Sequence, residues 1–232
     1  FWDVLVGHQV KAYFCSHILA FDVQVHQGVL QVLTAGAGTA HRMPEGVEYL
    51  HCVQAAVDSD GLRYQVLDTE GEIREWLAWP PVLPLSSEWT LINEGVIPNP
   101  ITCKPEINET LIVVFEFMGT VSSQSEIQPT QTLLSVWENQ ANLSQLWIGV
   151  GYNQRLVVKM SPGVGRSPHM WIGLRIDLNK PFSIQIALHG GMGAGGIMWR
   201  WDDDAPWTSL DGISYWGVER LTWGQYWSIG YG

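Results

Sequence analysis

The sequence predicts an all-β protein, built as a sandwich or a barrel. Three observations lead to this prediction. Apolar and polar residues alternate in many short runs, and turn sequences rich in Gly and Asp separate these runs at intervals of roughly 8–12 residues. No helical period of useful length interrupts the series. Since side chains of a strand alternate between two faces, such runs are typical of strands with one buried face.

The N-terminal part contains five such runs, and each predicts a strand. They are residues 21–27, 29–33, 47–53, 62–67 and 72–77. Residues 11–21 fit either a helix or a strand, because Phe14, Ile18 and Phe21 would share one face of a helix. Turn sequences at residues 34–38, 43–46, 58–61 and 68–71 divide the series into hairpins.

A cluster of prolines between residues 80 and 105 marks the expected boundary between two parts. Proline has no backbone N–H to donate, so it interrupts strands. We therefore expect a smaller β-rich domain over residues 1–95 and a larger β-sandwich over residues 96–232. The strands expected in the second part are residues 110–117, 132–138, 145–150, 155–160, 170–177, 182–188, 196–201 and 225–232.

Composition excludes several classes of protein. A formal net charge of -11 argues against a nucleic-acid-binding surface, which should be basic. No apolar run approaches the ~18 residues of a membrane-spanning helix. The three cysteines (Cys15, Cys52 and Cys103) form no C-x-x-C pair and lie among apolar neighbours. We expect buried free thiols, with a Cys15–Cys52 disulfide as the alternative.

Residues 106–232 resemble the concanavalin A-like lectin/glucanase superfamily, particularly its laminin-G-like members. The resemblance rests on strand order and on five sequence features: a Phe-rich strand at 114–117, a hairpin at 145–159, and strands with the sequences WIGLRID at 171–177, IQIALHGG at 184–191 and WSIGYG at 227–232. It implies an antiparallel jelly-roll sandwich. Relatives of this kind are common among glycan-binding proteins and among phage tail and capsid-decoration proteins.

The resemblance implies a structural or recognition protein that is not an enzyme. The protein would be a surface, decoration or appendage component of a virion, or an extracellular protein. Its partners would be subunits of a larger assembly, a homo-oligomer, or a cell-surface or matrix glycan. Two alternatives stay open on the same fold: a polysaccharide-active hydrolase or lyase, and a secreted lectin.

Catalytic motifs are weak. Glycoside hydrolysis needs two opposed carboxyl groups, and the only match to the superfamily's Glu-x-Asp-x-x-Glu motif is Glu70, Glu72 and Glu75, which we interpret as part of a solvated hairpin. Residues 191–196 match G-x-G-x-x-G, but a strand rather than a helix is expected to follow, so no nucleotide site is predicted.

Tryptophan is the most informative residue type, because nine of the thirteen lie in the second half of the chain. Trp147, Trp171 and Trp227 lie inside apolar strands, where a core position is expected. Trp207, Tyr215, Trp216 and Trp223 lie in loop-rich sequence. We assign these four to a glycan- or protein-contacting surface, with a core position as the alternative.

The sequence contains one candidate metal site. Asp202, Asp203 and Asp204 are consecutive carboxylates at the end of an expected strand, and carboxylate oxygens are ligands for Ca²⁺. We favour a solvated acidic turn at these three residues, with a Ca²⁺ site as the alternative. No other cofactor is expected, since the seven histidines show no zinc-binding spacing.

Overall fold

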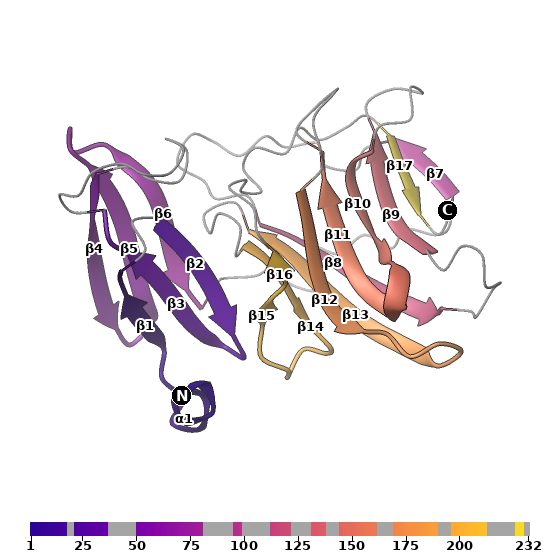
Figure 1. Ribbon diagram of the computed structural model, residues 1–232, viewed down its shortest axis with the longest axis horizontal. Coiled ribbons are helices and arrows are strands. Elements are labelled where there is room, and N and C mark those ends of the chain that lie inside the picture. The colour runs from indigo at the N-terminus through magenta and orange to yellow at the C-terminus, as the bar shows by residue number, and fades with distance from the viewer. Residues whose placement is uncertain are drawn as a thin grey trace.

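The computed structural model describes residues 1–17, 21–36, 50–80, 95–98, 112–121, 131–137, 144–161, 169–189, 196–212 and 226–229. Its strands form four sheets (Figure 1). The helical elements in this part of the chain are short: helix α1 (Trp2–Gly7) and the 3-10 turn η2 (Tyr152–Gln154). The all-β prediction is therefore confirmed.

Two three-stranded sheets form the N-terminal part. The first has the order β1-β3-β2 and the second is the meander β4-β5-β6. All pairs are antiparallel except β1 with β3, which is parallel. Residues 12–15, which fitted either a helix or a strand, form a strand. The bounds are β1 (Ala12–Cys15), β2 (Phe21–His26), β3 (Val29–Thr34), β4 (His51–Asp58), β5 (Gly61–Asp68) and β6 (Ile73–Trp79).

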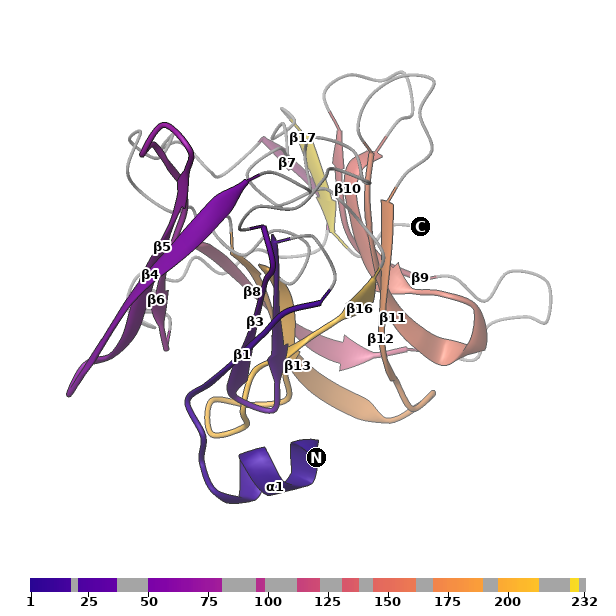
Figure 2. The same cartoon turned by 60° about the vertical axis from the view of Figure 1, so that its left-hand side comes forward.

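The remaining strands form a seven-stranded and a four-stranded antiparallel sheet (Figure 2). The seven-stranded sheet runs in the order β16 (Asp211–Gly212), β12 (His169–Arg175), β11 (Arg155–Met160), β10 (Ser144–Val150), β9 (Gln131–Trp137), β17 (Tyr226–Ile229) and β7 (Gly95–Pro98). The four-stranded sheet runs in the order β15 (Thr208–Ser209), β14 (Ile197–Arg200), β13 (Pro181–His189) and β8 (Ile112–Thr120).

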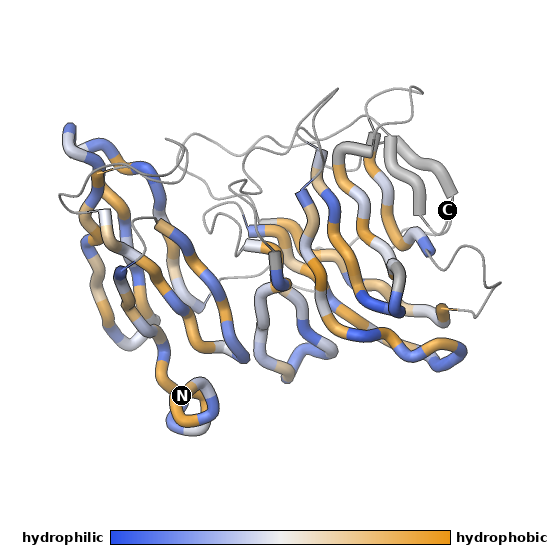
Figure 3. The backbone as a smooth tube through the Cα atoms, in the orientation of Figure 1, coloured by the Kyte–Doolittle hydropathy of each residue, from blue (hydrophilic) through white to orange (hydrophobic). Residues whose placement is uncertain are grey.

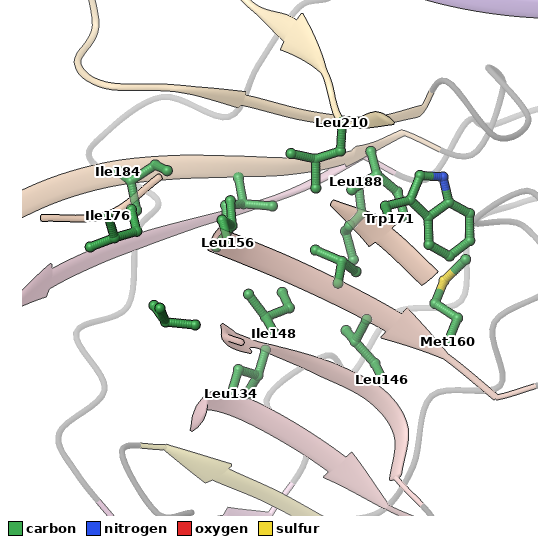
Figure 4. Close-up of a cluster of buried hydrophobic side chains, with 14 of the residues drawn as sticks. Leu134, Leu146, Ile148, Leu156, Met160, Trp171, Ile176, Ile184, Leu188 and Leu210 are labelled. Carbon is green, nitrogen blue, oxygen red and sulfur yellow. The ribbon is translucent and has the colours of Figure 1, made fainter. Parts of the chain in front are cut away.

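A first hydrophobic core lies between these two larger sheets. Alternate residues of each strand enter it, and the alternation of apolar and polar residues is visible along the chain (Figure 3). Figure 4 shows side chains from both sheets meeting, among them Leu146 and Ile148 of β10 and Ile184 of β13. Trp171 is fully buried in this core, as expected.

A second core joins the N-terminal sheets to the other face of the four-stranded sheet. It contains Val23, Tyr64 and Leu77 together with Ala187 and Met198. Neighbours of Ala187 and Met198 on the same two strands point into the first core, so β13 and β14 are buried on both faces. The two parts on either side of the expected boundary therefore share a core.

Two predictions about single residues are wrong. Trp147 does not lie in the core: Leu146 and Ile148 point inward, so Trp147 points outward, where Lys159 lies 4.8 Å above its ring. Cys52 is exposed rather than buried, and both Cys15 and Cys52 are free thiols. Trp227 and Cys103 lie outside the residues whose side chains are described. In the described part of the chain, no helix is long and apolar enough to cross a membrane.

Candidate functional site

The acidic sequence at 202–204 forms an exposed turn that leaves β14. The Oδ1 atom of Asp202 accepts hydrogen bonds from the backbone N–H groups of Asp204 (3.1 Å) and Ala205 (2.8 Å). A short carboxylate side chain that binds nearby N–H groups stabilises a tight turn. Asp202 is therefore committed to the backbone of its own turn.

Asp203 ties the turn to the sheet through charged and amide partners. Its Oδ1 atom accepts hydrogen bonds from Arg200 Nη2 (2.7 Å) and Gln185 Nε2 (2.9 Å). Arg200 also donates from Nε to Gln185 Oε1 (2.8 Å) and from Nη1 to the backbone oxygen of Asp203 (2.8 Å). Gln185 and Arg200 are paired residues of β13 and β14, so the sheet fixes this network.

The three aspartates do not converge on one point, because each has a different surrounding. Among the residues that the structure describes, no group of three His, Cys, Asp or Glu side chains could hold a metal ion. Calcium binding at this turn stays a prediction from the sequence. The geometry shows an exposed turn at these residues.

An exposed tryptophan lies at the start of the same turn. Trp201 is 38% exposed, and the ring of Trp199 meets it edge to face, with centroids 5.8 Å apart and planes at 82°. Trp199 in turn packs against the first core. The partly buried Trp199 therefore restrains the exposed ring of Trp201. Trp201 was not among the contact residues predicted from the sequence.

Trp207 occupies a core position, the alternative to the contact surface that was predicted for it. It is 7% exposed and belongs to the second core. The guanidinium group of Arg200 lies 4.6 Å from the centroid of its ring, a cation–π contact. Trp207 is therefore a core residue, and its ring contacts Arg200, which binds Asp203 of the turn. Tyr215, Trp216 and Trp223, the other predicted contact residues, lie outside the described residues.

A buried histidine lies further along β13. His189 is 2% exposed, and its side chain has the same parity along the strand as that of Gln185. Burial disfavours the charged imidazolium and lowers the pKa of His189 to about 4. At neutral pH this side chain is therefore uncharged.

The carboxylates at 70, 72 and 75 form part of a hairpin, as interpreted from the sequence. Asp68 closes the turn between β5 and β6 by accepting hydrogen bonds from the N–H groups of Glu70 (3.0 Å) and Glu72 (2.9 Å). Its second oxygen accepts a bond from Arg74 Nε (2.7 Å). These bonds explain the position of Asp68 by turn formation.

One hollow was not predicted by sequence analysis. A cavity of about 670 Å³ opens between the sheet β1-β3-β2 and strand β4. Phe14, Val53 and Ala55 form its apolar wall, and Thr34 and His51 form part of its polar wall, with 3.1 Å between Thr34 Oγ1 and His51 Nε2. Its walls come from three strands that meet only in the folded chain, so no local sequence pattern could indicate it.

Comparison with known proteins adds no assignment: no protein-family model matches the chain, and no curated protein matches it.

Proposed function

We propose that this protein is a non-enzymatic recognition module that binds carbohydrate at the turn 201–205. The observation that carries the proposal is the exposed ring of Trp201, which lies on one short turn with the anchored carboxylate of Asp203. A sugar ring presents an apolar C–H face and a rim of hydroxyl groups. An indole ring suits the first, and a carboxylate accepts hydrogen bonds from the second.

Preorganisation supports the proposal. Trp199 restrains the Trp201 ring, while Arg200 and Gln185 fix the Asp203 carboxylate. The Asp203 side chain is nevertheless 81% exposed, so one face of it is open to solvent. Groups that are already held in place lose little entropy when a ligand binds. The turn therefore presents an aromatic platform beside a fixed hydrogen-bond acceptor.

A glycan array probed with the full chain tests this function, and isothermal titration calorimetry should follow for each glycan bound. We expect Trp201→Ala to weaken binding by about tenfold or more, corresponding to a lost aromatic contact of about 1.4 kcal/mol. Trp76→Ala is the matched control, because Trp76 is a similarly exposed tryptophan (45%) on strand β6. An array without hits, or equal effects of the two substitutions, would contradict the proposal.

The setting implied by the resemblance is part of the same proposal: a virion or extracellular particle that contains many subunits. Light scattering on the native particle, taken from its natural source, measures this directly. A defined assembly much heavier than the 26.0 kDa chain supports that setting. A particle with the mass of one chain would instead favour a secreted lectin.

A further inference from the structure

Strand β4 is a long sheet edge. It pairs with β5 along its whole length, from His51 with Asp68 to Asp58 with Gly61. On its other side it has no partner strand among the described residues, and it forms the outer edge of its sheet (Figure 1). A free edge presents unpaired N–H and C=O groups that another strand can bind.

Two other strand edges of the N-terminal part, those of β2 and β6, are protected, whereas β4 has a single described backbone bond outside its ladder with β5, from the N–H of His51 to the backbone oxygen of Gly36 (3.3 Å). The N–H group of Val25 on β2 binds the hydroxyl group of Ser209, and the N–H group of Gln27, in the turn after β2, binds that of Thr208. Strand β6 carries adjacent charges at Arg74 and Glu75 and an irregular register with β5. Charges and irregularities of this kind discourage pairing with another chain. The sequence of β4, HCVQAAVD, has a single formal charge, which is at its end.

The inward face of β4 is buried at His51, partly buried at Val53, which packs against the second core, and exposed and apolar at Ala55 and Val57. Val53 and Val57 stand opposite Val66 and Leu62 of β5, which are buried in the second core. Paired residues share one face of a sheet, so both valines point to the core side. Val57 is nevertheless 75% exposed. The covering sheet stops short of β4, and the cavity beside Val53, next to the 42% exposed Phe14, lies at this gap.

We infer that β4 pairs with β4 of a second copy of this chain, antiparallel and centred on Ala55. A two-fold axis perpendicular to the sheet keeps the inward faces of both copies on the same side. It places Val53 opposite the partner's Val57, and Ala55 opposite its own equivalent. The strand is nearly symmetric about this centre, with a valine two residues on either side. Isologous interfaces require such self-complementarity.

The charges of β4 favour a second copy as its partner. In this register Asp58 stands opposite Cys52, so the two Asp58 carboxylates lie six residues apart. Six residues of a strand span ~20 Å, about twice the screening length at physiological salt. The only formal charges on the two strands therefore do not repel each other strongly. The pairing also places Val57 of each copy opposite Val53 of the other, and Val53 lines the open cavity.

Sedimentation equilibrium of the full chain over a wide concentration range tests the inference. We expect a reversible change from 26.0 kDa to twice that mass. Each copy carries a net charge of -11, so added salt should strengthen the association by screening their repulsion. Val57→Lys should weaken it by about tenfold or more, because it places a charge in the apolar seam. Ile73→Lys on β6, where Ile73 is 57% exposed, is the matched control and should leave it unchanged.

Cross-linking gives a second measurement that does not depend on the stability of the Val57 variant. In the background Cys52→Ser, the substitution Ala55→Cys should place two thiols across the two-fold axis and yield a disulfide-linked dimer on mild oxidation. The same substitution at Ile73 should not. A chain that stays monomeric at every concentration, or a dimer equally sensitive to Ile73→Lys, would overturn the inference. Glycan binding at Trp201 is measured in a separate experiment. A negative result for dimerisation therefore does not affect the test of glycan binding, and a negative result for glycan binding does not affect the test of dimerisation.

Discussion

The hydroxyl group of Ser209 accepts a hydrogen bond from the backbone N–H of Val25 at 2.8 Å, joining segments 184 residues apart in the sequence. Both residues are buried. Next to this bond, the N–H of Gly28 donates to the backbone oxygen of Trp207 at 2.8 Å. These bonds attach the edge of β2 to β15, beside the second hydrophobic core. We therefore expect the N-terminal sheets and the four-stranded sheet to unfold together.

Ser209→Ala should lower the free energy of unfolding by about 1–3 kcal/mol, because it leaves the buried N–H of Val25 without its partner. Equilibrium urea unfolding measures the change, and the transition should remain single. The control is Thr208→Val, since Thr208 accepts an exposed bond from the N–H of Gln27 at 3.2 Å. Its effect should stay within about 0.5 kcal/mol. Equal losses from both variants would show that the buried bond has no special role.

A glycine on the outward face of β10 provides a second test. Gly149 lies two residues after Trp147, and a methyl group added there would collide with the Trp147 ring and with the backbone oxygen of Gln131. Gly149→Ala should therefore cost about 1–3 kcal/mol of stability, as overpacking does. A methyl group added at Gly119 of β8 would meet no other atom within 4 Å. Gly119→Ala should not destabilise the protein, and thermal unfolding of both variants compares them directly.

The strands could be predicted because period-two alternation is a local property of the sequence. The second core could not, because it depends on how distant strands meet. Trp147 shows the difference: its apolar neighbours suggested burial, yet those neighbours occupy the inward face and leave the tryptophan outside. Trp207, in loop-like sequence, is buried because residues 206–209 pack against the hairpin of β2 and β3.

The candidate site was predicted in position but not in role. An acidic turn after the strand at 197–200 could be inferred from the sequence. The separate roles of Asp202 and Asp203 depend on the pairing of Gln185 with Arg200, which places an amide and a guanidinium group beside one carboxylate only. Likewise, the open edge of β4 becomes visible only when the sheet order is known.

Asp203→Ala should lower the free energy of unfolding by about 1 kcal/mol. The Arg200 side chain is only 14% exposed and would lose its carboxylate partner, although screening at the exposed Asp203 keeps the effect modest. Asp204→Ala is the matched control, because the Asp204 side chain makes no hydrogen bond or ion pair with the described residues. It should change stability by less than about 0.5 kcal/mol. A larger loss from Asp204→Ala would contradict the assigned network.

His189 should make the protein less stable as the pH falls from about 6.5 to about 4. The pKa of this histidine is 6.5 when unperturbed and about 4 in the folded chain, because burial disfavours the imidazolium. Above this range both states are neutral, and the histidine imposes no cost. Within the range the unfolded chain takes up a proton that the folded chain does not. Unfolding is therefore favoured progressively, by about 3 kcal/mol in total.

Urea unfolding of the wild type and of His189→Gln at a series of pH values isolates this contribution. The substitution removes the titrating group, so the difference in unfolding free energy between the two proteins should shrink as the pH falls through this range. Carboxylates that titrate near the lower end affect both proteins and cancel in the difference. A difference that stays constant from pH 7 to pH 4 would show that His189 takes up its proton equally in the folded and unfolded chains.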